Sequence, residues 1–300
     1  MRAVQVLEFG GPEVLTVVDV PVQDPGPGQI RVAVAAVAVN PFDCEWRKGG
    51  HDIPLPRTIA SDVAGFVDAI GDAVDDVSLG DAVFGAAVAG GASDFALLQS
   101  WTIKPAALSD QEAACFVTPA ETAVRALDLL GVGRGTRLVI DGASGGVGSA
   151  ATQIAVSRGA RVVGTSSLTN FDFVAALGAT PVEHGGGIGD RARPVLAEID
   201  AVLDVAGQTD IKELVAMVEP PDKVVSVANF DAPTHGARVT DGSEGRAWHG
   251  LRTAADLFEQ GAFRMEIAQV FGLAEAGLAH AACEARSTRG RIVISVSPGP

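Results

Sequence analysis

The 300-residue sequence contains no tyrosine, so a mechanism in which a phenol of this chain donates a proton is excluded. The cysteines are too few and too scattered for a disulfide framework or a four-cysteine zinc site; they are Cys44, Cys115 and Cys283. No apolar run approaches the roughly 18–20 residues of a membrane span. The first residues also lack the apolar core and cleavage signature of a signal peptide. These absences predict a soluble, cytoplasmic protein with no membrane partner.

Positive charge is also scarce, because 22 Lys and Arg residues face 37 Asp and Glu residues, for a formal net charge of −15. This charge argues against a nucleic acid partner, since neutralising phosphates needs a basic face. The hydrophobic content of 47% and the charged content of 20% are ordinary for a globular protein and too apolar for disorder. A chain of 300 residues is comfortable for two domains.

The first third of the sequence is typical of β structure. Short apolar runs are separated by Gly and Pro about every ten residues. This spacing predicts a compact, mostly antiparallel barrel or sandwich rather than βαβ repeats. Strands are expected at Arg2–Phe9, Glu13–Val20, Ile30–Val39, Thr58–Gly71 and Asp81–Phe84.

The pattern changes at Ser109, which is followed by an acidic residue three positions later, Glu112, as at the start of a capped helix. Ala113–Leu130 has room for one or two helices. Beyond it, strand-like and helix-like segments alternate, which predicts a parallel sheet covered on both faces. Its strands are expected at Thr136–Ile140, Ala160–Thr165, Pro181–His184, Ile199–Val205 and Lys223–Ala228. Helices at Leu251–Gln260 and Leu273–Ala285 then precede a closing strand at Arg291–Val296.

A glycine-rich turn, Val139–Gly148, follows a predicted strand and opens a predicted helix. Ala143 stands where the first glycine of a G-x-G-x-x-G pattern is expected. Such a turn lets the backbone approach a pyrophosphate, whose charge meets the free amides of the helix N-terminus. It predicts dinucleotide binding, with a merely tight strand–helix turn as the alternative. The expected contacts are Ser144, Gly145, Gly146 and Val147.

The next strand ends without the acidic residue that binds the ribose hydroxyls in NAD sites. Hydroxyl and amide groups at this position favour a 2′-phosphate, and therefore NADP over NAD, although the sequence has no Arg or Lys between Arg161 and Arg191. His184, after the following strand, is expected to contact the adenine or the phosphate; a surface histidine is the alternative. The predicted ribose-side residues are Thr165, Ser166, Ser167 and Asn170.

Several motifs together resemble the medium-chain dehydrogenase/reductase superfamily, specifically its zinc-free NADPH:quinone oxidoreductase branch. They are Phe9–Leu15, Pro25–Ile30, Val39–Asp43, Ser61–Gly65, Gly80–Gly85, the Ala143–Gly148 turn and Arg289–Val293. The resemblance implies an α/β protein with a GroES-like antiparallel β-barrel catalytic domain, residues 1–117 and 249–300. A doubly wound Rossmann domain, residues 118–248, is inserted between these two parts. It also implies a homodimer, expected to be joined through the apolar strand Lys223–Ala228.

Zinc-dependent members of the superfamily hold their metal at three positions that here carry Asn40, Ser61-Asp62 and Thr118. These side chains do not make a tetrahedral zinc site, so no metal is expected. By the resemblance, Asn40 and Thr122 are the catalytic and nicotinamide-side residues. Bracing the turn before Pro41 is an equal alternative for Asn40, and a helix surface position is an alternative for Thr122. Residues after two later strands are expected to line the cofactor cleft: Val205, Ala206 and Val227.

Without a metal to polarise a hydroxyl group, the implied chemistry is hydride transfer from NADPH to an electron-poor acceptor, a quinone or an α,β-unsaturated carbonyl. Because tyrosine is absent, water, His51 or Lys48 is left as the proton source, and a quinone needs no dedicated donor. Two alternatives stay open. One is an enoyl-thioester or biosynthetic enoyl reductase on the same scaffold, and the other is a catalytically idle NADPH-binding sensor or structural protein.

Overall fold

The computed structural model describes residues 1–50, 54–285 and 289–296, which form two compact units. Unit 1 comprises Met1–Thr118 and Arg264–Pro300, and unit 2 comprises Pro119–Phe263. Helix α7 (His249–Glu259) belongs to unit 2, beyond the predicted limit at residue 248. Its Gly250 packs so closely on helix α2 (Asp110–Leu130) that an added Cβ would lie 2.9 Å from the Ala120 carbonyl oxygen. The functional limits of the domains stay a prediction.

Unit 1 contains a six-stranded sheet in the order β14-β15-β3-β5-β6-β7, and a further β3–β7 pairing closes four of these strands, β3, β5, β6 and β7, into a barrel. All of its pairings are antiparallel except β14 with β15. The predicted antiparallel barrel is therefore present, with two strands that the sequence did not indicate, β7 and β14. The bounds are β3 (Ile30–Val39), β5 (Asp62–Ile70), β6 (Ala82–Ala87), β7 (Phe95–Ile103), β14 (Ile267–Gly272) and β15 (Arg291–Ser295).

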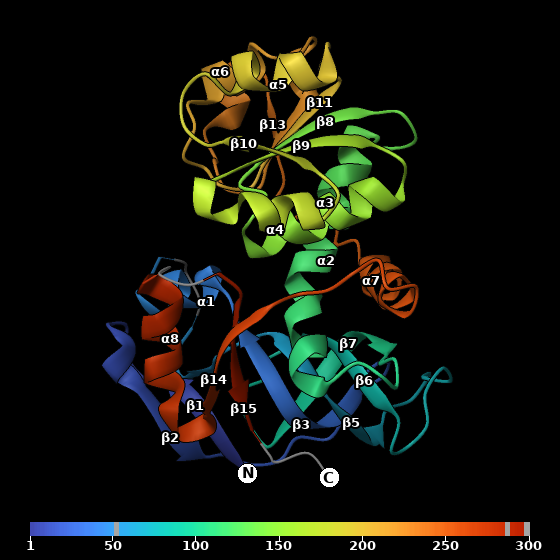
Figure 1. Ribbon diagram of the computed structural model, residues 1–300. Helices are drawn as coiled ribbons and strands as arrows, with labels where there is room; N and C mark the ends of the chain where they lie inside the picture. The colour runs from blue at the N-terminus through green and yellow to red at the C-terminus, as the bar shows by residue number, and fades with distance from the viewer. Residues whose placement is uncertain (51–53, 286–288, 297–300) are drawn as a thin grey trace. The chain divides into compact units, whose positions relative to one another are not determined.

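A second, three-stranded sheet of unit 1 has the order β2-β1-β4. Two helices, α1 and α8, pack against each other at one side of the barrel (Figure 1). Pro41 at the first position of α1 fixes a helical φ, which explains why a short helix follows Asn40 directly. The bounds are β1 (Arg2–Val6), η1 (Pro12–Val14), β2 (Leu15–Asp19), α1 (Pro41–Arg47), β4 (Arg57–Thr58), η5 (Leu273–Glu275) and α8 (Ala276–Ala285).

Helix α2 (Asp110–Leu130) is one continuous helix whose first residues belong to unit 1 and whose remainder belongs to unit 2. Its N-terminus is capped as the sequence predicts: the Glu112 amide donates to Ser109 Oγ (3.2 Å), and the Ser109 amide donates to Glu112 Oε2 (3.1 Å). Pro119, which cannot donate a helical hydrogen bond, lies at the boundary of the two units.

Unit 2 is built on a parallel sheet in the order β10-β9-β8-β11-β12-β13, which is the 3-2-1-4-5-6 order of a doubly wound Rossmann sheet. Helices α3 and α4 cover one face, and α5 and α6 cover the other (Figure 1). The strands are β8 (Arg137–Asp141), β9 (Arg161–Ser166), β10 (Thr180–Glu183), β11 (Ala201–Asp204), β12 (Val224–Ser226) and β13 (Arg238–Val239). The helices are α3 (Gly146–Ser157), η2 (Leu168–Asn170), α4 (Phe171–Ala176), α5 (Ile188–Leu196), α6 (Ile211–Val215), η3 (Pro221–Lys223) and η4 (Ala232–His235).

The predicted dimer edge is wrong in one respect. Strand β12, within Lys223–Ala228, is not at the edge of the sheet, because the chain returns through η4 and adds the two-residue strand β13 in parallel to it. An edge-to-edge assembly on this side of the sheet would therefore use β13. The homodimer itself stays a prediction.

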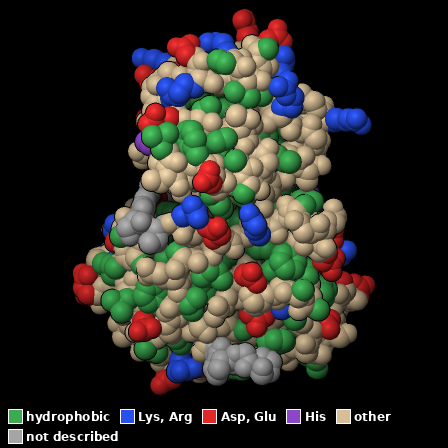
Figure 2. Space-filling model, viewed as in Figure 1, with side chains coloured by type: hydrophobic (Ala, Val, Ile, Leu, Met, Phe, Trp, Pro, Cys, Tyr) green, Lys and Arg blue, Asp and Glu red, His purple; other side chains and the backbone are tan. Residues whose placement is uncertain are grey.

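The surface carries both signs of charge, and acidic and basic side chains are interspersed on the face shown in Figure 2. Within the described ranges, no helix has both the length and the apolar character needed to cross a membrane.

Candidate functional site

The glycine-rich turn connects the carboxyl end of β8 to the start of α3, as predicted. Gly142 has a φ of +95°, a conformation that favours glycine. The Gly145 amide donates to the Gly142 carbonyl oxygen (3.1 Å), and an added Cβ on Gly148 would lie 2.1 Å from the same oxygen. The helix therefore approaches the end of the strand so closely that only glycine fits at position 148.

The departure at Ala143 is compensated on the neighbouring strand. The Ala143 methyl group is fully buried, and an added Cβ on Gly164 of β9 would lie 2.6 Å from it. Gly164 thus makes room for the side chain that replaces the first glycine of the motif. The turn keeps its tight packing although one of its glycines is absent.

The turn fits a pyrophosphate. Gly145 is exposed and has a φ of −77°, and its added Cβ would meet only the Gly142 carbonyl oxygen, at 3.5 Å. The amides of Gly146 and Val147 lie in the first turn of α3, where a helix offers them no acceptor, and Ser144 is partly exposed beside them. The backbone here is open to a ligand and presents donors to an anion.

Thr165 braces this turn from β9. Its hydroxyl donates to Asp141 Oδ1 and accepts from the Gly142 amide (2.9 Å), and its side chain is fully buried. Asp141 Oδ2 is buried and has no hydrogen-bond partner among the described residues. Of the predicted ribose-side residues, Thr165 therefore serves the geometry of the turn itself.

The other ribose-side residues lie together at the carboxyl end of β9. Ser166 is its last residue, Asn170 Nδ2 donates to Ser167 Oγ (3.1 Å), and the His184 amide donates to the Ser166 carbonyl oxygen (3.0 Å). The structure thus brings Ser166, Ser167, Asn170 and the exposed His184 to one edge of the sheet. Their contact with a cofactor stays a prediction.

A buried carboxylate that the sequence analysis missed organises the next strands. Asp204, at the end of β11, accepts hydrogen bonds from the amides of Ala206 (3.1 Å) and Gly207 (2.8 Å) and from Ser226 Oγ of β12 (2.8 Å). Burial raises the pKa of Asp204. Its bonds fix the loops that carry Val205, Ala206 and Val227 at the carboxyl edge, beside the switch between β8 and β11.

In unit 1, the three positions aligned with zinc ligands do come together, as a hydrogen-bonded network. Asp62, which is fully buried, accepts from Asn40 Nδ2 (3.0 Å), from Thr118 Oγ1 (2.6 Å) and from the Thr118 amide (3.2 Å). Arg291 Nη2 donates to Asn40 Oδ1 (2.7 Å) and lies 3.5 Å from Asp62 Oδ2. Burial raises the pKa of Asp62, and its partners Arg291, Thr118 and Asn40 oppose this. The positively charged group in this network is therefore the guanidinium of Arg291.

Arg291 was not recognised as a site residue from the sequence. The available signal was a cation at the start of an otherwise apolar closing strand. Asn40 has the bracing role considered for it, and its catalytic role stays a prediction. Its amide donates to Asp43 Oδ2 (2.7 Å) and braces α1, while its side chain joins the network.

Thr122 lies on the part of α2 that belongs to unit 2, next to a second buried network. The Glu121 carboxylate accepts from Arg125 Nε (2.8 Å) and from the Ala247 amide (2.9 Å). Thr122 Oγ1 lies 3.4 Å from Glu121 Oε2, and its side chain is buried rather than on an open helix surface. Burial raises the pKa of Glu121, but the hydrogen bonds from Arg125 and Ala247 outweigh it, so the pKa is lowered.

No group of three His, Cys, Asp or Glu side chains among the described residues is placed to hold a metal ion. The Cys44 thiol lies 3.6 Å from His280 Nδ1. Burial lowers the pKa of His280 to about 3. A hydrogen bond with Cys283, together with burial, raises the pKa of Cys44. Of the candidate proton donors, His51 lies outside the described residues, and Lys48 Nζ forms an ion pair with Glu284 (3.0 Å).

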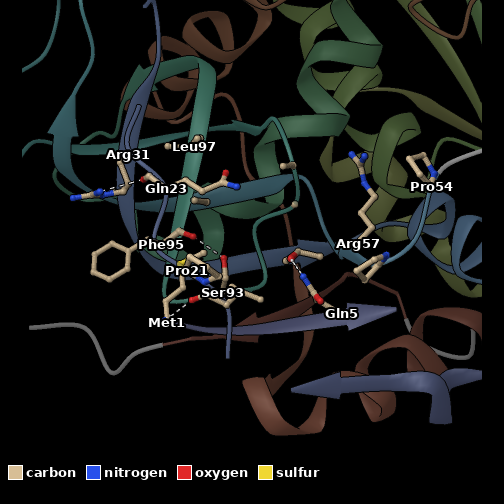
Figure 3. Close-up of a pocket in the computed structure, with 16 residues that line it drawn as sticks. Met1, Gln5, Pro21, Gln23, Arg31, Pro54, Arg57, Ser93, Phe95 and Leu97 are labelled. Atoms are coloured by element: carbon tan, nitrogen blue, oxygen red, sulfur yellow. Dashed lines mark hydrogen bonds between the residues drawn. The ribbon is translucent and has the colours of Figure 1, made fainter. Parts of the chain in front are cut away.

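A cavity of about 440 Å³ lies elsewhere in unit 1, between β1, β4, β3 and β7 (Figure 3). Its guanidinium groups are already engaged: Arg31 bonds to Asp68 (2.7 Å) and Asp24 (2.9 Å), and Arg57 lies over the Trp46 ring, 5.8 Å from its centroid. None of the predicted site residues lines this cavity, so it is not the predicted cleft.

Two domain families match the chain: the alcohol dehydrogenase GroES-like domain over residues 26–104, and zinc-binding dehydrogenase over residues 171–294. Quinone oxidoreductase of Pseudomonas aeruginosa is 30% identical over 330 residues, which cover 98% of this chain and 99% of that protein. Quinone oxidoreductase of Mus musculus is 42% identical over 173 residues, which span 55% of this chain and only 52% of the mouse protein.

Solved structures agree with the fold. An alcohol dehydrogenase superfamily protein from Novosphingobium aromaticivorans has a TM-score of 0.87 and 30% identity, covering 99% of this chain and 100% of its own. A mycobacterial protein solved in complex with NADPH has a TM-score of 0.84 and 26% identity, again covering 99% and 100%. The predicted combination of a GroES-like barrel with a Rossmann sheet is confirmed.

We expect Gly145→Val and Gly148→Ala to separate ligand binding from folding. Valine at position 145 fits the free turn but fills the space that a pyrophosphate needs, so NADPH binding should be lost while the free energy of unfolding changes by less than about 0.5 kcal/mol. Alanine at position 148 clashes with the Gly142 carbonyl and should cost about 1–3 kcal/mol. Thermal unfolding without cofactor and an NADPH titration check both. If Gly145→Val bound NADPH normally, the cofactor site would not be at this turn.

The second expectation concerns Asp43, a buried residue. Burial, with a contribution from the nearby Asp62, raises the pKa of Asp43 to about 7, although the Asn40 amide and Arg291 act to lower it. The folded state therefore holds this proton more tightly than the unfolded chain, so stability falls as pH rises from about 4 to about 7. Asp43→Asn keeps an acceptor for the Asn40 amide and removes the titration. The free energy of unfolding of this variant minus that of the wild type, measured in urea, should grow by roughly 2 kcal/mol between pH 5 and pH 7. A constant difference would contradict the assignment.

Proposed function

Because the chain belongs to the medium-chain dehydrogenase/reductase superfamily, we propose that it is a zinc-independent oxidoreductase that uses NADPH to reduce a quinone or an α,β-unsaturated carbonyl. One observation carries the proposal. At the positions of the zinc ligands, this chain has an amide, a carboxylate and a hydroxyl that bond to one another, closed by the Arg291 guanidinium. Such a centre offers hydrogen-bond donors in place of a Lewis acid, which suits an acceptor that is already electron-poor.

NADPH, when bound, supplies the hydride. The chain's own residues bind and orient it. The turn at Ser144, Gly145, Gly146 and Val147 receives the pyrophosphate, and Ser166, Ser167 and Asn170 donate hydrogen bonds on the ribose side. The loops that Asp204 fixes, with Val205, Ala206 and Val227, line the cleft. The mycobacterial structure solved with NADPH supports this cofactor for the present chain.

Asn40 is the proposed donor to the reacting groups. Arg291 holds its side-chain oxygen and Asp62 holds one of its N–H groups, so the amide cannot flip. The second N–H and a remaining lone pair keep a fixed direction, which suits orientation of the nicotinamide amide or of an acceptor carbonyl. Thr122 is proposed to contact the nicotinamide from α2.

A quinone is favoured over an enone because the chain has no tyrosine to protonate carbon. The hydroquinone anion takes its protons from solvent, whereas an enone needs a donor at its α-carbon. The quinone oxidoreductases among its relatives support the same choice. An enoyl-thioester or biosynthetic enoyl reductase is the second candidate, and an idle NADPH-binding sensor or structural protein is the third.

We also propose a cytoplasmic homodimer. The Rossmann sheet ends in the short strand β13, whose outer edge is free to pair within the described part of the chain.

The proposal predicts that NADPH is oxidised when the protein is mixed with quinones, with slower or no oxidation by enones, and that a chelator leaves the rate unchanged. The change in nicotinamide absorbance measures the rate for each acceptor in a panel, and Gly145→Val is the control that lacks the cofactor site. Tight NADPH binding with no oxidation by any acceptor would establish the idle class instead. Loss of activity on chelation would contradict the zinc-independent mechanism.

Cofactor preference gives a separate prediction. Ser166→Asp places a carboxylate where NAD enzymes carry one, so it should repel the 2′-phosphate and reverse a preference for NADPH into one for NADH. Each tenfold change in the ratio of the two dissociation constants corresponds to about 1.4 kcal/mol. Thr180→Asp is the matched control, because Thr180 is exposed at the opposite, amino end of β10. A wild-type protein that binds NADH as tightly as NADPH would refute the preference.

A further inference from the structure

The ribose side of the proposed cofactor site, at the carboxyl end of β9 and in the turn after it, has neutral donors but no cation of its own. Ser167 Oγ, Thr169 Oγ1 (2.9 Å) and Asn170 Nδ2 (3.1 Å) bond among themselves there. A 2′-phosphate carries up to two negative charges, and sites that select it commonly use Arg or Lys. The sequence has neither residue between Arg161 and Arg191.

The structure brings Arg191 back to this edge of the sheet. From α5, its guanidinium reaches the segment that follows β10 and donates to the carbonyl oxygens of Glu183 (3.0 Å), Gly185 (2.5 Å) and Gly186 (2.7 Å). Gly185 and Gly187 have φ values of +89° and +82°, so this loop adopts a conformation in which its carbonyls surround one cation. Arg191 is thereby fixed in place.

The same loop is bonded directly to the ribose-side strand. Glu183, whose carbonyl accepts from Arg191 Nε, is the partner of Ser166 in the β9–β10 register. The His184 amide donates to the Ser166 carbonyl oxygen (3.0 Å). Adjacent strands lie about 4.8 Å apart, so the Glu183 backbone to which the guanidinium bonds lies one strand away from Ser166.

Arg191 also keeps the capacity to bind an anion. A guanidinium has five N–H groups, and the three described acceptors of Arg191 are all neutral backbone carbonyls. The carboxylates nearby have other partners: Asp190 lies 3.8 Å from Arg193, and Glu213 Oε1 accepts from the Ile188 amide (2.7 Å). The side chain is partly exposed, so its remaining N–H groups can reach a ligand.

We propose that Arg191 is the cation that recognises the 2′-phosphate of the cofactor and thereby sets the preference for NADPH. This inference rests on the proposed function, because it names the residue that distinguishes the two dinucleotides at the same site. The neutral donors Ser166, Ser167 and Asn170 complete the phosphate's hydrogen bonds, and Arg191 supplies the charge. Because three carbonyls hold the guanidinium in advance, little side-chain freedom is lost on binding.

The test compares dissociation constants of NADPH and NADH, measured with the full chain by quenching of protein fluorescence and without turnover. Arg191→Gln should weaken NADPH binding about ten- to a hundredfold and change NADH binding less than about threefold. Arg193→Gln is the matched control: it removes the same charge from the same helix, at an exposed position, and should change neither constant. An unchanged NADPH/NADH ratio in Arg191→Gln, or an equal loss for both dinucleotides, would overturn the inference.

Two further measurements test the inference if Arg191→Gln folds poorly: a conservative variant, and the salt dependence of binding by the wild type. Arg191→Lys retains the charge and should keep most of the preference, and NADPH binding by the wild type should weaken with added salt more than NADH binding does. Equal salt dependence for the two dinucleotides would overturn the inference. A different result would contradict the proposed function. If the wild type prefers NADH, the proposed NADPH preference is wrong. If the NADPH preference survives Arg191→Gln, only the role of Arg191 in that preference is wrong.

Discussion

Unit 1 depends on one buried charge, the Asp62 carboxylate. A carboxylate with no exposure must be bonded on both oxygens, because an isolated ion in a protein interior is very costly. Its partners come from three separate places in the chain: Asn40 at the end of β3, Thr118 in α2 and Arg291 at the start of β15. Satisfying Asp62 therefore fixes the side chain of Asn40, brings α2 against the barrel and ties in the last strand. The same bonds leave no ligand set for a metal at these positions.

The glycine-rich turn of unit 2 depends on close contact between backbones rather than on charge. At the turn after β8, the helix lies so close to the strand that residue 148 has no room for a methyl group, and the methyl of Ala143 occupies the space that Gly164 leaves open. Two glycines, Gly148 in α3 and Gly164 in β9, thus together allow this close packing. A motif read along the chain contains only half of this fit, because the compensating residue lies on the neighbouring strand.

This difference between local and distant information explains what the sequence could predict. The capped start of α2, the strands of the Rossmann sheet and the glycine turn depend on neighbours within a few residues, and the structure has them where expected. The network around Asp62 involves residues 229 positions apart, and Arg191 reaches the backbone at the end of β10 only because α5 folds back onto the loop that follows this strand. Strand β13 was missed because two residues give no periodic signal. Glu121 and Asp204 were missed because a carboxylate in an apolar segment looks exposed until its buried donors are known.

The position of β15 has a consequence for the order in which the chain is completed during translation. Strand β15 lies between β14 and β3, and its partners Val39, Ala38, Val37 and Ala36 are made about 250 residues earlier. Until it emerges from the ribosome, the Ala36–Val39 part of one edge of β3 is unpaired and Asp62 lacks the Arg291 cation. Unit 2 is continuous in sequence and is synthesised in full before that point. We therefore expect the Rossmann unit to fold first on the ribosome, while the nascent barrel remains the part that needs protection from aggregation.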